Sequence, residues 1–201
     1  MRTLAIAGAC ILGVIVLMGV SAAASGGRDH SGEQVRANKW ADDVCGTVGA
    51  WEGQLEDIRE DLRHNNWAAR RSDGYTGDSE EQVVTINGAV DRMIRATQDT
   101  LQEGLKRAGI PDTGQGAAAS AILRDWANDT ELRLRVAKAV IKEKPTSVAE
   151  SFASLIPPYA ALARSLVAGR AAVAKVEAVD SGLADALDRS GNCRRLKKRD
   201  A

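Results

Sequence analysis

Aromatic residues are scarce in this chain: they make up 3% of its 201 residues, whereas apolar residues reach 44% and alanine is abundant. A core with so few rings has to be filled by small and aliphatic side chains, which suits closely packed helices. A charge excess of either sign is also missing, because 27 basic residues balance 27 acidic ones. Nothing in the overall charge therefore favours nucleic acid, and we expect no such partner.

Histidine is nearly absent, with two residues, His30 and His64. A di-metal site in a helical bundle needs two E-x-x-H motifs, and His64 offers only an imperfect half-motif with Asp61. The sequence also lacks the G-x-S-x-G nucleophile turn and the glycine-rich phosphate loops. We therefore expect no enzyme, no catalytic residue, no metal and no cofactor.

The N-terminus has the order of a secretory signal peptide, which we assign to residues 1–24. A short basic start precedes the apolar run 4–20, and small residues lead to a predicted cleavage site after Ala24. Cys10 lies inside the apolar run, before its most apolar part, so it is misplaced for lipidation. We expect a secreted or extracytoplasmic protein. The alternative is an uncleaved membrane anchor formed by residues 4–20, since this run is only just short of a bilayer span.

Only two cysteines, Cys45 and Cys193, remain once the signal peptide is removed. An even number of cysteines in an exported chain favours a disulfide. Two free buried thiols are the alternative. A zinc site is disfavoured, because neither cysteine belongs to a C-x-x-C pair.

Apolar residues recur every three or four positions in four long segments, which is the pattern of helices that bury one face. After a flexible linker (25–34), we expect helices from Val35, from Ser79, over 115–143 and up to 190, joined by loops that include 64–78. The four predicted buried stripes are Trp40, Val44, Val48, Trp51, Leu55, Ile58 and Leu62; Val83, Ile86, Val90, Ile94, Thr97, Leu101 and Leu105; Ile122, Trp126, Thr130, Leu134, Ala137 and Ile141; and Leu162, Leu166, Val173, Val176, Val179, Leu183 and Leu187.

The expected fold is all-α: an antiparallel up-down-up-down four-helix bundle over residues 35–193. Its fourth helix is predicted to be kinked at Pro157-Pro158 or to restart there, because proline is tolerated only in the first turn of a helix. In this order the first helix begins at the end of the bundle where the fourth helix finishes. Topology therefore brings Cys45 towards Cys193, which independently favours the disulfide.

Two features are candidate interaction surfaces. Trp67 and Tyr75 share the predicted loop with Arg70 and Arg71, and loop aromatics beside arginines are enriched at interfaces; alternatively, Trp67 folds back to cover the end of the bundle. The tail 194–201 is basic and could contact anionic lipid or a wall polymer, or remain a solvated, disordered tail. Its cations are Arg194, Arg195, Lys197, Lys198 and Arg199.

The chain resembles small secreted or lipoprotein-like helical proteins of actinobacteria. The resemblance rests on the leader, on Trp40 with Cys45, on Trp51 with Leu55 and Ile58, on the stretch AGIPDTG, and on a final Cys193 and Leu196. It covers most of the mature chain and implies a helical fold and an exported location. It implies no activity and no catalytic residue.

We expect a non-enzymatic protein of the cell envelope, acting as a structural or protein-interaction module with an envelope or extracellular partner. Such a module predicts a filled core and an exposed apolar patch at one end. The alternative is a carrier of a small apolar ligand or lipid, which predicts a cavity among Trp51, Trp126 and the Pro157-Pro158 site.

Overall fold

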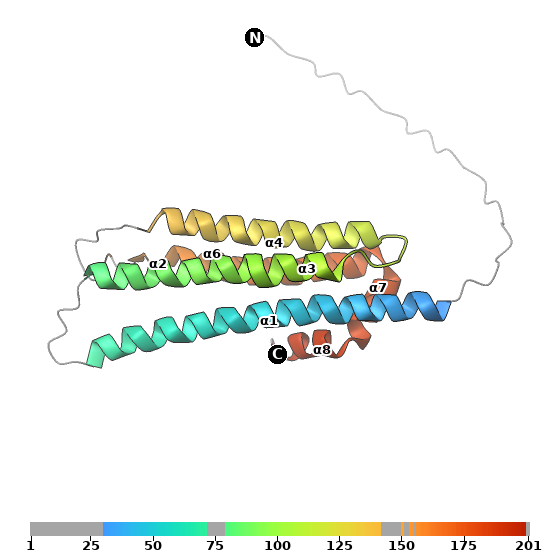
Figure 1. Cartoon of the computed structure of the whole chain (residues 1–201), viewed down its shortest axis with the longest axis horizontal. Helices are drawn as coiled ribbons and strands as arrows, with labels where there is room; N and C mark the ends of the chain where they lie inside the picture. Colours follow the sequence, from blue (N-terminus) through green and yellow to red (C-terminus); the bar gives the residue numbers. More distant parts are fainter. Residues whose placement is uncertain (1–29, 72–78, 142–149, 151–152, 155, 200–201) are drawn as a thin grey trace, which may run out of the picture.

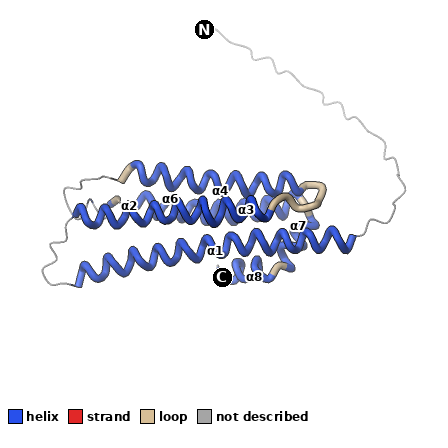
Figure 2. The backbone as a smooth tube through the Cα atoms, in the orientation of Figure 1, coloured by secondary structure: helices blue, strands red, loops and turns tan. Residues whose placement is uncertain are grey.

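Every regular element in the part of the chain that the structure describes is a helix (Figure 2). The all-α class is therefore confirmed there, while the predicted signal peptide and residues 25–29 of the linker lie outside it. The computed structural model describes residues 30–71, 79–141, 150, 153–154 and 156–199, with side chains at 36–64, 83–141, 150, 153–154 and 156–198.

Helix α1 spans His30–Arg71 and is longer than predicted at both ends. It begins inside the expected linker, and it continues through residues 64–71, where we predicted a loop. That loop prediction was wrong for these residues because asparagine is only mildly unfavourable in a helix, and the alanines and arginines that follow are strong helix formers. All seven residues of the predicted first stripe are buried.

A second rod consists of α2 (Ser79–Arg95), the π-helical turn η1 (Ala96–Gln102) and α3 (Glu103–Ala108). It starts at the predicted residue, and all seven residues of its predicted stripe are buried. Gly109 ends it with a φ of 75°, a conformation that only glycine adopts without strain.

The π-helical turn lies where α1 meets the second rod. Thr97 within η1 donates a hydrogen bond from Oγ1 to Met93 O (2.9 Å) and accepts one from Trp51 Nε1 (3.1 Å). A π-turn widens the helix and leaves backbone groups less regularly paired. The buried threonine hydroxyl therefore satisfies a backbone carbonyl and the Trp51 indole at once.

Helices α4 (Gly116–Ala139) and α6 (Ile156–Val179) pack closely against each other. The contact depends on Gly169, where a Cβ would lie 2.6 Å from Trp126 Cζ2. Trp126 Nε1 donates to Ser165 O (2.9 Å), so the ring occupies the space that the missing side chain of Gly169 leaves open. Pro157 and Pro158 fall in the first turn of α6, the part of a helix where proline is tolerated.

The fourth predicted helix is divided into α6 and α7 (Ser181–Arg189), and a further helix, α8 (Gly191–Arg199), follows where we predicted the end of the bundle and a tail. The first break occurs at Asp180, whose carboxylate accepts hydrogen bonds from Gly182 N (2.9 Å) and Leu183 N (3.1 Å) and so caps α7. Because the chain turns there, Val179 leaves the buried face and is 39% exposed. Its assignment to the fourth stripe was wrong.

Asp180→Ala is expected to lower the free energy of unfolding at neutral pH by about 1 kcal/mol, the usual contribution of a helix N-cap. Burial alone would raise the pKa of Asp180, but its hydrogen bonds outweigh burial and lower that pKa. The cap therefore stabilises the fold fully above the unfolded carboxyl pKa, and this contribution is lost as the pH falls through the lower folded pKa. Urea denaturation at neutral and at acidic pH measures this. A difference between wild type and variant that grows on acidification would contradict it, and Asp180→Asn, which keeps the cap, is the control.

The long helices lie alongside one another, and the chain reverses direction between α1 and the second rod (Figure 1). Helix α6 packs against α4 and α7, whereas α7 and α8 both contact α1. The C-terminal helix α8 therefore returns along α1 instead of extending α6. This return assembles the site described next.

Candidate functional site

The predicted pairing of Cys45 on α1 with Cys193 on α8 is confirmed at bonding distance. The two Sγ atoms lie 1.98 Å apart and the Cα atoms 5.0 Å apart, across a sequence separation of 148 residues. Both residues are buried. The bond fastens α8 to the first half of α1.

Hydrogen bonds fix the start of α8 on α1. Ser190 Oγ accepts a hydrogen bond from Cys193 N (3.2 Å), which caps the helix, and donates one to Asp42 Oδ1 (2.5 Å). Asn192 Nδ2 donates to Asp42 O (2.9 Å). The Ser190 and Asn192 side chains at the start of α8 therefore both bond to Asp42 of α1. Cys45, the disulfide cysteine of α1, lies one turn after Asp42.

Helix α8 forms one wall of a cleft of about 290 Å³, whose other walls come from α1, α4, α6 and α7. Both disulfide cysteines, Gly169 and the Trp126 ring lie against this space. Trp126 Nε1 is already bonded to Ser165 O, so the ring presents carbon to the cleft. The aliphatic lining residues are Val48, Leu166, Val173, Ala174, Leu187 and Leu196.

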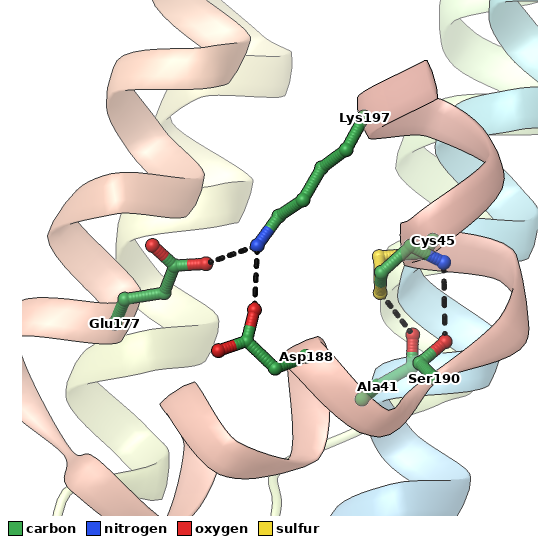
Figure 3. Close-up of polar contacts among 7 residues, drawn as sticks. Ala41, Cys45, Glu177, Asp188, Ser190 and Lys197 are labelled. Carbon is green, nitrogen blue, oxygen red and sulfur yellow. Dashed lines mark hydrogen bonds and ion pairs between the residues drawn. A yellow bond between two sulfur atoms is a disulfide. The ribbon is translucent and has the colours of Figure 1, made fainter. Parts of the chain in front are cut away.

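The charged residues of the lining are Glu52, Arg170, Glu177 and Lys197. Lys197 Nζ reaches from α8 to Glu177 Oε1 on α6 (3.3 Å) and to Asp188 Oδ1 on α7 (2.7 Å), as Figure 3 shows. Its hydrogen bond to Asp188 is the main cause that raises the pKa of Lys197, and the same bond lowers the pKa of Asp188. Both groups therefore stay charged between these two pKa values.

The structure corrects our reading of the basic tail. Residues 194–199 belong to α8, and Leu196 packs partly buried against the core. A solvated, disordered tail is therefore wrong for this part. Arg194, Arg195, Lys197 and Lys198 are all exposed, but Lys197 also lines the cleft and pairs with Glu177 and Asp188. Successive residues of a helix point in different directions, so the linear run of cations did not show which of them reaches the cleft.

The other candidate surface falls mostly outside the described residues. Trp67, Arg70 and Arg71 belong to the backbone of α1, their side chains are not among those described, and Tyr75 lies outside the described part. The proposed Trp67–Tyr75 surface therefore remains a prediction.

Sequence reasoning placed Leu166 and Val173 of α6 on a buried stripe, but it did not single out Arg170 and Glu177, the charged residues of α6 that line the cleft. The available signal was Gly169, a glycine in the middle of a long helix, which often marks a close approach. The predicted cavity was also misplaced. Of the three features expected around it, which were Trp51, Trp126 and the Pro157-Pro158 site, only Trp126 lines the cleft.

A second, larger groove of about 720 Å³ lies between α2 and α4. It is more polar, and its charged side chains pair across it and along α4: Lys138 Nζ lies 2.5 Å from Asp91 Oδ1, and Arg135 Nε lies 2.7 Å from Glu131 Oε1. Ligand sites are usually concave and mostly apolar. The smaller cleft beside the disulfide therefore fits a ligand site better.

Within the residues that the structure describes, no three histidine, cysteine or acidic side chains gather closely enough to hold a metal ion. The same residues include no helix with the length and apolar character needed to cross a membrane.

Comparison of the chain with protein-family models, with curated proteins and with solved structures finds no match. The cleft must therefore be interpreted from its own chemistry.

Proposed function

We propose that this chain is an exported, non-enzymatic helical protein that binds a small apolar molecule in the cleft between α1, α6 and α8. The observation that carries this proposal is the cleft itself, an apolar space lined by six aliphatic side chains, the Trp126 ring and a disulfide. Its volume of about 290 Å³ lies at the lower end of ligand pockets, which span roughly 300–1,000 Å³. That size favours a small ring system or a short single chain over a two-chain lipid.

Export is the second part of the proposal. The signal-peptide pattern of residues 1–24 supports it, and so does the Cys45–Cys193 pair, because disulfides persist mainly in oxidising compartments. The exported protein then has two alternative forms: one is released by cleavage after Ala24, and the other is anchored in the membrane by residues 4–20.

We also propose that the long helices follow the antiparallel up-down-up-down order. The reversal between α1 and the second rod (Figure 1) and the junction of α8 with the first half of α1 support this order.

Filling the cleft should abolish ligand binding. Ala174 lines the cleft and is exposed, so Ala174→Trp is expected to place an indole in the cleft without disturbing the core. Ala171→Trp is the matched control, since Ala171 is exposed one turn earlier on α6 and does not line the cleft. Native mass spectrometry should find an apolar ligand on wild type and on the control, and none on Ala174→Trp.

Titration calorimetry with decanol gives a second readout of the same comparison. If wild type purifies empty and binds no decanol, the cleft is not a ligand site. Equal binding by Ala174→Trp and wild type would place the ligand elsewhere.

A second candidate function, a protein-interaction module, is favoured by one observation on α4. Leu132 and Val136 on α4, and Val140 directly after its last residue, follow at four-residue intervals and are 59%, 59% and 58% exposed. Spacing by four aligns them as one apolar stripe, of the kind that binds a partner helix. A photoreactive residue at Val136 is expected to cross-link a defined protein in the envelope, and one at exposed Arg124 is not. Identical cross-linking from both positions would remove this candidate.

A further inference from the structure

The charged residues of the cleft balance one another. Glu52 and Glu177 supply two negative charges, and Arg170 and Lys197 supply two positive ones. An apolar site that took an anionic ligand would be expected to carry an excess of cations, and one that took a cation an excess of carboxylates. This cleft has neither.

These charges are also engaged already. Lys197 Nζ is shared between Glu177 Oε1 at 3.3 Å and Asp188 Oδ1 at 2.7 Å (Figure 3). Glu52 and Arg170 each have an interaction of their own. A charged ligand would therefore have to break one of these contacts or remain unpaired beside Trp126 and the aliphatic wall. Leaving an ionised group unpaired beside an apolar wall is unfavourable.

We propose that the cleft selects small molecules without net charge, and that the Lys197–Glu177 ion pair determines this selectivity. The inference rests on the proposed ligand-binding function and adds the chemical class of the ligand: an apolar body with at most an uncharged polar group. Lys197 acts as a specificity-determining residue because its position on α8 lets one ammonium neutralise carboxylates from α6 and α7.

The contact of Lys197 with Asp188 should persist over a wide pH range. Lys197 has a raised pKa and Asp188 a lowered one, each mainly through their mutual hydrogen bond. Changing the charge of a ligand head group at neutral pH therefore tests the cleft with its own charges unchanged.

Titration calorimetry of the mature chain with decanol below its solubility limit, and with decanoate and decylamine below micelle formation, tests the inference. These three compounds share one apolar chain and differ in head-group charge. Decanol is expected to bind at least about tenfold more tightly than either charged compound, since about 1.4 kcal/mol of unpaired charge suffices for that ratio. Decanoate or decylamine binding as tightly as decanol would overturn the inference while leaving the ligand-binding function intact. Failure of all three to bind would overturn both.

A change of specificity gives a readout that a merely structural role of Lys197 would not produce. Lys197→Met leaves the Glu177 and Asp188 carboxylates unneutralised beside the cleft, so decylamine is expected to bind about tenfold more tightly than to wild type. Lys198→Met is the matched control, because Lys198 is exposed on α8 and does not line the cleft. Unchanged decylamine affinity in a folded Lys197→Met would refute the role of Lys197. If that variant does not fold, the wild-type comparison of the three head groups still decides the main claim.

Discussion

Replacing Trp51 with alanine is expected to lower the free energy of unfolding by about 3–5 kcal/mol, the range measured for large aromatic residues in protein cores. Trp51 is fully buried. Its ring meets Trp126 edge-on, with ring centroids 5.6 Å apart, and its indole nitrogen bonds to Thr97 in the π-turn. One side chain therefore joins α1 to both the second rod and α4, and its removal leaves a cavity where three helices meet.

The size of this effect matters because a domain has only about 5–15 kcal/mol of net stability. Urea denaturation followed by circular dichroism measures it. Trp51→Phe is the control: it keeps a ring beside Trp126 and loses mainly the hydrogen bond to Thr97, so a loss of about 1–2 kcal/mol is expected. A loss below about 1 kcal/mol for Trp51→Ala would show that the core is not organised around this residue.

The buried faces of α1 and the second rod could be predicted because the sequence determines them locally. Residues such as Trp40, Val44 and Val48 recur at the helical period, and a helix has one stripe to bury whatever packs on it. Even Thr97, a polar residue, was placed correctly by its register. What register could not show was the π-turn around Thr97 or the hydrogen bond that Thr97 accepts from Trp51 of another helix.

The fourth predicted helix illustrates the limit of periodicity. Val176, Val179 and Leu183 are spaced as they would be in one continuous helix. The apolar pattern therefore continues past Asp180, although the helix itself is interrupted there. The signal was present in Asp180 and Ser190, since both residue types favour helix N-caps and both cap a new helix here. Local capping preference prevailed over the apolar period at these two positions.

The cleft could not be predicted because it depends on two contacts between helices that are distant in the sequence. Gly169 lets Trp126 lie against α6, and the turn at Ser190 sends α8 back along α1. The sequence marks the first contact only by a glycine within a helix and the second only by the cysteine pair, and neither mark shows that a space is left between the helices. Lys197 appeared as one of five similar cations, and only its distances to Glu177 and Asp188 separate it from its neighbours.

Removing the disulfide is expected to have the other large effect. The bond between Cys45 and Cys193 closes a loop of 148 residues, for which the chain-entropy estimate is about 5 kcal/mol, at the upper end of measured effects. In the double variant Cys45→Ala, Cys193→Ala, a loss of about 3–5 kcal/mol should lower the melting temperature by about 10 °C or more. Thermal melts with and without a thiol reductant measure this. Reductant should destabilise wild type and leave the double variant unchanged.

The same variant separates stability from function. Without the bond, α8 is held on α1 by the Ser190 and Asn192 contacts to Asp42, partly exposed hydrogen bonds that contribute about 0.5–1.5 kcal/mol each. Helix α8 supplies Leu196 and Lys197 to the cleft, so decanol binding should be lost at temperatures well below the melting transition. Wild-type affinity in a folded double variant would show that the disulfide secures the chain ends but not the cleft. A melting temperature equal to that of wild type would show that the disulfide does not stabilise the fold.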